Sequence, residues 1–192
     1  MARRMALSAD HPLRKLFRKA LDFGFQENTA DMPGVGTYLE ENILCEFIHT
    51  DNLYKIKDAA GKPIEDVADL LAEGDVRLNA PSFNREFEVH KHIGDYTLFM
   101  LGMFPMALAR RSGKEFILGR IIVPGSTLYQ HYLLQGKRSY GLASEFSERE
   151  LFLELSTNFL LYRNVLELVR IYLDTAKNRD YLRAKKLISG TE

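Results

Sequence analysis

The chain has 192 residues, of which 46% are hydrophobic and 11% aromatic, so it is too apolar to be disordered and can fill one core. Its 26 basic and 26 acidic residues cancel, and a neutral chain without a basic stripe argues against nucleic-acid binding. The single cysteine, Cys45, excludes an internal disulfide framework and a cysteine-rich zinc site, and it indicates a cytoplasmic protein. At this length we expect one domain over 1–192.

The first third of the chain reads as two helices and a turn. Pro12 followed by apolar residues at helical spacing predicts a first helix that Gly24 ends. Apolar spacing over 35–50 predicts a second helix, with Cys45 inside it as a buried, unreactive thiol. Two short apolar stretches around an Asp-Ala-Ala-Gly turn favour a small hairpin at 53–64.

The middle of the chain combines a long helix with a segment that is hard to assign. Ser82 is a candidate N-cap for a helix that runs to about Ala109. The nearly uncharged run within it, 96–109, is shorter than the roughly 18 residues of a membrane span, so we expect a buried helix and no membrane segment. Glycines recur every few residues over 111–141, which predicts an irregular excursion.

The last third opens on the clearest local signal of the sequence. The run 147–150, Ser-Glu-Arg-Glu, has the pattern of a capping box, with Phe146 and Leu151 placed as a hydrophobic staple. One long helix should follow to about Ala176, and a short helix should close the chain. On a helical wheel the long helix has one apolar seam, made of Leu151, Leu155, Phe159, Tyr162, Leu166, Val169 and Leu173. The fold class is therefore all-α, a single-domain bundle of about five to seven helices.

Acidic residues and histidines alternate in the run 85–95, Arg-Glu-Phe-Glu-Val-His-Lys-His-Ile-Gly-Asp. On a helix Glu88, His92 and Asp95 share one face. Glu86 and His90 form a second four-residue pair, on the side that should face the core. Such a pair can ligate a metal, act as a general acid and base, or satisfy its own hydrogen bonds, and we favour the last.

Any metal held by Glu86 and His90 would need a ligand from elsewhere, and Glu154, His131 and His49 are the candidates. Glu154 and Asn158 lie one turn apart within the broad apolar arc of the capped helix. A buried carboxylate must be neutral, paired or hydrogen-bonded, so we favour a polar link between helices. A polar pocket that joins Glu154 to His90 is the alternative.

A third polar cluster is the run 136–141, Gly-Lys-Arg-Ser-Tyr-Gly. Lys137 and Arg138, followed by Ser139 and Tyr140, could hold an anion. The pattern is not a phosphate-binding loop, because no Gly-x-x-x-x-Gly-Lys-Ser/Thr occurs in the chain. We therefore expect a surface turn here, with an arginine–carboxylate contact.

Three short runs resemble a group of bacterial helical proteins that have a His-Ile-Gly-Asp helix and a Lys-Arg-Ser-Tyr turn. They are 92–99, 102–105 and 136–140, and the similarity covers about 87–144. That pattern has an acidic residue after Phe-Pro, where this chain has Met106, and the departure weakens any metal site that needs a carboxylate there. The resemblance implies a cytoplasmic bacterial protein and no particular reaction.

No specific catalytic motif is present, so we expect a non-catalytic helical protein without a cofactor. It would self-associate, most simply as a C₂ homodimer, or bind a partner or a small ligand. The alternative is a metal-dependent or acid/base enzyme that uses Glu86, His90 and Glu154. Heme binding through His90 or His92 is permitted but not indicated. The candidate ligand-binding residues are Glu86, His90, His92, Asp95, Lys137, Arg138, Tyr140, Glu154 and Asn158.

Overall fold

The computed structural model describes residues 7–28, 34–64, 67–74, 82–106, 115–118, 121–124 and 128–189. Helices dominate these ranges, which confirms the all-α class, and they pack around one core. The helical segments outnumber the five to seven expected, because two of the predicted helices are each divided. None of the described helices is long and apolar enough to cross a membrane.

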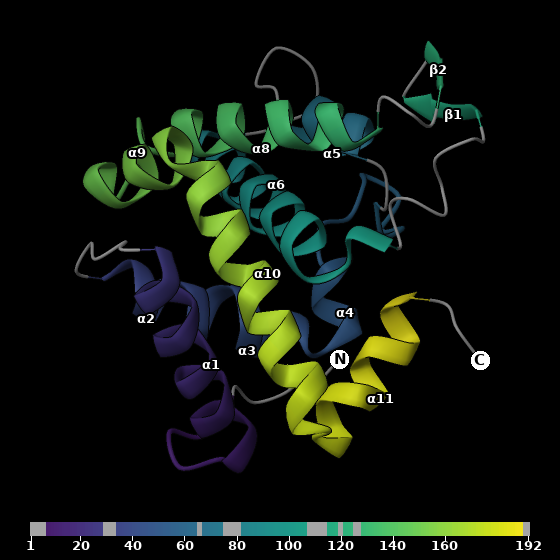
Figure 1. The fold of residues 1–192 in the computed structure, drawn as a ribbon. Helices are drawn as coiled ribbons and strands as arrows, with labels where there is room; N and C mark the ends of the chain where they lie inside the picture. Colours follow the sequence, from purple (N-terminus) through teal and green to yellow (C-terminus); the bar gives the residue numbers. More distant parts are fainter. Residues whose placement is uncertain are drawn as a thin grey trace.

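Four long helices build the core. The central helix is α6 (Phe83–Met103), which packs against α8 (Leu128–Ala143) and α10 (Phe159–Ala176), while α1 (Pro12–Asn28) packs along α10 (Figure 1). The predicted N-cap of α6 is confirmed, because Ser82 Oγ accepts a hydrogen bond of 3.2 Å from the backbone N–H of Arg85. From Val89 onward nearly every residue of α6 is buried, so polar side chains on this helix must find partners inside the bundle.

The predicted second helix, 35–50, is divided. It consists of α2 (Val35–Tyr38), a π-helix, η1 (Leu39–Leu44), and α3 (Cys45–Phe47), followed by α4 (Thr50–Leu53). The π-helical segment is only six residues long, too short for the apolar spacing to distinguish it from an α-helix. The hairpin expected at 53–64 is reduced to a turn with one antiparallel bridge, between Lys57 and Pro63.

The excursion predicted over 111–141 is wrong for its second half. Residues 128–141 belong to α8, so Lys137 to Tyr140 lie on a helix rather than in a surface turn. Two short antiparallel strands, β1 (Glu115–Leu118) and β2 (Ile121–Pro124), lie at the periphery (Figure 1). The rest of the predicted excursion lies outside the described residues. The predicted end of the helix near position 109 is wrong, because α6 ends at Met103 with Phe104 as its C-cap. Phe104 precedes Pro105, and a residue in that position disfavours the helical conformation.

The long capped helix is also divided, into α9 (Arg149–Thr157) and α10, with Asn158 between them. The capping box is not formed: Glu148 is the N-cap, in a left-handed conformation and without a side-chain cap hydrogen bond. The apolar seam is confirmed, because six of its seven positions are buried and Leu151 packs against the core. The closing helix is α11 (Arg179–Ser189), and α5 (Val67–Gly74) covers the start of α6.

Glycines mark the places where helices approach closely. Gly24, which was expected to end α1, lies inside it, and a Cβ there would be 2.9 Å from the carbonyl oxygen of Val165 on α10. A Cβ at Gly94 of α6 would be 2.6 Å from the Tyr140 ring of α8. The short side chain therefore permits a close crossing rather than breaking the helix at these positions.

Gly136 and Gly141 on α8 provide a test of this interpretation. A Cβ at 136 would lie 2.4 Å from Thr97 Oγ1 and 2.6 Å from the Phe159 ring, so Gly136→Ala should lower the free energy of unfolding by about 1–3 kcal/mol. At 141 the nearest atom, Ser156 Oγ, is 3.4 Å away, so Gly141→Ala should leave stability unchanged or raise it by up to about 1 kcal/mol. Urea unfolding followed by circular dichroism measures the free energy of unfolding of both variants. Equal losses of stability in the two variants would contradict the role of Gly136 in helix packing.

Candidate functional site

A buried carboxylate on the central helix organises the polar interior. Asp95 is 1% exposed, and its Oδ1 accepts hydrogen bonds from Tyr38 Oη (2.6 Å) and Tyr140 Oη (2.9 Å). Its Oδ2 accepts one of 2.8 Å from Lys91 Nζ. The carboxylate thus has donors from α2, α6 and α8, which offset the cost of burying a charge.

Lys91 links this buried carboxylate to the surface. It lies one turn before Asp95 on α6, and its side chain is 21% exposed. Its ammonium group stands 4.9 Å from the centre of the Tyr38 ring and donates a 3.3 Å hydrogen bond to Asn42 Oδ1. Burial, and then the charge of Asp95, raise the pKa of Tyr38 and of Tyr140 well above the ordinary value, so both hydroxyls act as neutral donors.

An open groove of about 660 Å³ lies directly outside this network, between the segment 34–42 and the start of α9. Tyr38 and Asn42 belong both to the network and to the groove lining. Four exposed charged residues also line the groove, together with Gly34, Thr37 and Leu151; the charged ones are Glu41, Glu148, Arg149 and Glu150. A ligand in the groove would therefore contact side chains that are bonded directly to the buried charges.

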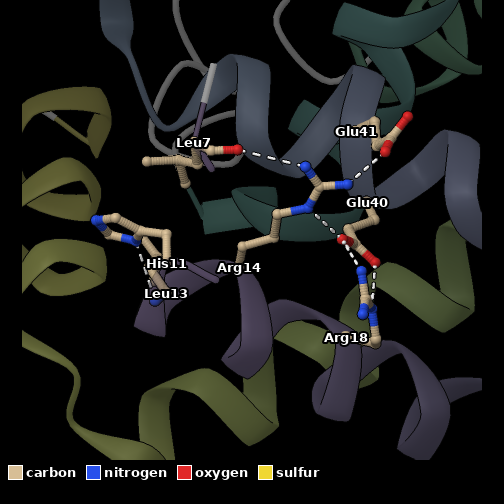
Figure 2. Close-up of polar contacts among 7 residues, drawn as sticks. All are labelled: Leu7, His11, Leu13, Arg14, Arg18, Glu40 and Glu41. Atoms are coloured by element: carbon tan, nitrogen blue, oxygen red, sulfur yellow. Dashed lines mark hydrogen bonds and ion pairs between the residues drawn. The ribbon is translucent and has the colours of Figure 1, made fainter. Parts of the chain in front are cut away.

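The π-helical wall of the groove is held in place by two arginines of α1 (Figure 2). Arg14 Nε donates to Glu40 at 2.6 Å, and Arg18 donates to the same carboxylate through Nε (3.0 Å) and Nη2 (2.9 Å). Arg14 also bonds Glu41 and the carbonyl oxygen of Leu7. Burial raises the pKa of Glu40, but the hydrogen bonds from Arg18 and Arg14 outweigh it and hold the pKa below its usual value.

The backbone is irregular on both sides of the groove. One wall is the π-helix, a conformation found frequently at functional sites. On the other wall Glu148 has φ 44°, a left-handed conformation that costs a non-glycine residue roughly 1–2 kcal/mol. Strain of this kind persists where the surrounding structure enforces it, and it points to this groove as the candidate functional site.

The predicted site residues are distributed over several places rather than one. Asp95 and Tyr140 are brought together, as described above. Glu154 accepts hydrogen bonds from Asn158 Nδ2 (2.8 Å) and from Tyr162 Oη (2.6 Å). Both Glu154 and Asn158 are only half-buried, so their expected deep burial is not observed.

The Glu/His cluster is divided as well. His90 is buried, with Nδ1 3.4 Å from Ser139 Oγ of α8, and a Cβ at Gly74 of α5 would be 3.5 Å from its Nε2. Glu86 is half-buried on α6. Over the ranges that the structure describes, no three His, Cys, Asp or Glu side chains are grouped to hold a metal ion, so Glu86, His90 and Glu154 do not form such a group.

Lys137 and Arg138 lie on α8 and not in the expected surface turn. Arg138 is exposed on α8, and the carbonyl oxygen of Lys137 accepts a 2.8 Å hydrogen bond from Ser156 Oγ of α9. This contact helps to hold α8 against α9. Cys45 is buried as expected, and burial raises its pKa to about 11, so little thiolate is present at neutral pH.

His92 is a core residue. It is 1% exposed, its Nε2 lies 3.2 Å from the carbonyl oxygen of Leu53, and its ring packs against Phe47 and Tyr96. Burial, with lesser contributions from nearby lysines, lowers its pKa to about 3. The imidazole is therefore neutral in the folded protein at neutral pH, and Nε2 donates to Leu53.

The sequence analysis missed the groove and most of the side chains that form it. The pair Lys91 and Asp95 was visible in the sequence, since lysine and aspartate four residues apart face each other on a helix. Two arginines four residues apart on α1, Arg14 and Arg18, were a similar signal for a buried acidic partner. Nothing local to Tyr38 marks it as a partner of Asp95, because 57 positions separate the two residues.

Removing individual donors tests the network around Asp95. Tyr38→Phe and Tyr140→Phe should each lower the free energy of unfolding by about 1.5–3 kcal/mol, because each removes a hydrogen bond to a charged acceptor. Asp95→Ala should cost more, about 3–5 kcal/mol, since it leaves Lys91 and two hydroxyls without their acceptor. Tyr172→Phe, at a half-buried position outside the network, is the control in the same denaturant titrations.

The neutral, buried state of His92 predicts a pH dependence of stability. The folded-state pKa of about 3 lies below the ordinary value of 6.5, so only the unfolded state takes up this proton as the pH falls below 6.5. The contribution of His92 is therefore complete above pH 6.5 and declines at lower pH by up to about 1.4 kcal/mol per unit. Denaturant titrations between pH 7 and 4 give the free energy of unfolding at each pH. This free energy should fall less steeply with decreasing pH in His92→Phe than in the wild type; equal slopes would contradict the prediction.

No protein-family model, no curated protein and no solved structure matches this chain, so its own geometry carries the functional argument.

Proposed function

We propose that this chain is a non-catalytic binding protein whose groove between the segment 34–42 and α9 binds a cationic group. The observation that carries the proposal is the position of the groove. A space of about 660 Å³ lies directly on Tyr38 and Asn42, which are bonded to the buried Asp95 and to Lys91. Pockets of this size, lined by a few convergent polar groups, are the usual sites for small ligands and inserted side chains.

The charges of the groove select the class of ligand. Glu41, Glu148 and Glu150 line it, against one guanidinium from Arg149. Because Glu41 is already paired with Arg14, the two carboxylates of the α9 segment carry most of the attraction for a cation. The recognised group is an ammonium or guanidinium, carried by a small molecule or by a side chain of a partner.

The network behind the groove supports binding rather than catalysis. Three donors engage the Asp95 carboxylate, and the pKa values of Tyr38 and Tyr140 are raised well above 10. These groups are therefore poorly matched to proton transfer near neutral pH. The enzyme alternative relies on Glu86, His90 and Glu154, and none of these three residues belongs to the groove lining.

A cytoplasmic location is part of this proposal. Its support is the buried, unpaired thiol of Cys45, which is typical of proteins from reducing compartments.

The substitution Glu148→Gly should have opposite effects on the stability of the protein and on cation binding in the groove. Glycine tolerates the left-handed conformation, so the free energy of unfolding should rise by about 1 kcal/mol, while one groove carboxylate is lost. Spermidine, a small polyamine, is the cationic probe. Each exposed charge contributes up to about 1 kcal/mol to the binding free energy, so Glu148→Gly should weaken spermidine binding up to about fivefold. Glu148→Gly combined with Glu150→Gln should weaken it further, as measured by isothermal titration calorimetry.

Lys177→Gly is the matched control, because Lys177 has φ 49° and does not line the groove. It should raise stability in the same way and leave spermidine affinity unchanged. Equal affinities for the wild type and the double variant would overturn the proposed cation site.

A further inference from the structure

The outer face of α10 exposes large apolar side chains in one stripe. Leu160 is 48% and Ile171 45% exposed, and eleven residues on a helix bring them within about 20° of each other. Asn164 is exposed between them, and Leu153 of α9, the helix before Asn158, is 40% exposed. Apolar side chains aligned in this way, next to polar ones, are typical of an association surface.

The two ends of this stripe carry opposite charge. The acidic groove, with Glu148 and Glu150 exposed, lies at the start of α9, the helix that precedes α10. At its other end α11 buries Tyr181 and Ala184 and turns an outer face to solvent, at positions 179, 182, 183 and 186. Three of these four residues are basic; they are Arg179, Arg183 and Lys186, beside the exposed Leu182.

We propose that two copies of this chain pair their α10 faces antiparallel across a two-fold axis, so that the basic face of α11 of each copy enters the acidic groove of the other. This inference rests on the proposed function, since α11 supplies the cationic group that the groove binds. It also gives a specific form to the homodimer expected from the sequence.

The arrangement along the molecule favours a two-fold pair. The helix α9, whose start borders the groove, and α11 join opposite ends of α10 (Figure 1), whose 18 residues span about 27 Å. A two-fold axis near the middle of α10 brings the acidic end of each copy to the basic end of the other, and it does so twice. A parallel pair would instead place Glu148 and Glu150 against the same carboxylates of the second copy, which like-charge repulsion disfavours.

A charge-reversal cycle tests the pairing. Sedimentation velocity over a micromolar concentration series should give a dimer for the wild type, and added salt should weaken its association. Lys186→Glu and Glu150→Lys should each raise the dimer dissociation constant at least tenfold. In the variant with both changes, the dimer dissociation constant should return to within about threefold of the wild-type value. Arg138→Glu, at an exposed position of α8, is the control and should leave the constant unchanged.

Leu160→Glu distinguishes this inference from the proposed function. The substitution places a charge in the apolar stripe, so this variant should be monomeric, folded by circular dichroism, and should bind spermidine more tightly because its groove is free. A monomeric wild type that still binds spermidine in the groove overturns the dimer and leaves the proposed function standing. A dimer whose dissociation constant is unchanged by Lys186→Glu and by Glu150→Lys overturns the contact between α11 and the groove. Loss of spermidine binding from the monomeric variant overturns the proposed function itself.

Discussion

The fold depends on one buried negative charge. A carboxylate in the interior is costly unless donors surround it, and Asp95 finds them on α2, on α8 and one turn earlier on its own helix. This requirement fixes how α2 and α8 sit on α6, because the two tyrosine hydroxyls must reach the same oxygen. The groove is a consequence, since Tyr38 can reach Asp95 only when the segment that carries it lies against α6.

A second charged contact fixes the same segment from the other side. Arg14 and Arg18 of α1 hold Glu40 (Figure 2). Lys91 of α6 contacts Asn42, two positions after Glu40. Charge-assisted hydrogen bonds thus hold the π-helix on two sides, to α1 through Glu40 and to α6 through Asn42. Apolar packing alone tolerates small rotations of a helix, whereas these contacts define its orientation and hence the shape of the groove wall.

The helical class, the N-cap at Ser82 and the buried seam of α10 could be predicted, because each depends on residues close together in sequence. The errors arise where distant contacts override local preference. Gly136 has the local signature of a loop, yet it lies inside α8, where the close approach of Thr97 and Phe159 leaves no room for a side chain. The sequence around Ser147 favours a capping box, but Glu148 takes the N-cap position where α9 borders the groove.

The π-helix has a consequence for how this chain can vary. A π-helical turn closes through hydrogen bonds one residue longer than those of an α-helix, so Leu39–Leu44 behaves like an α-helix that has accepted a single inserted residue. Deleting one residue there would restore α-helical winding, and the helical segments on either side would keep their orientation. Tyr38 would then stay on Asp95, and only residues within the turn, among them Glu41 and Asn42, would change their position in the groove wall. This turn is therefore the place where the groove wall can change in length while the core contacts around it are kept.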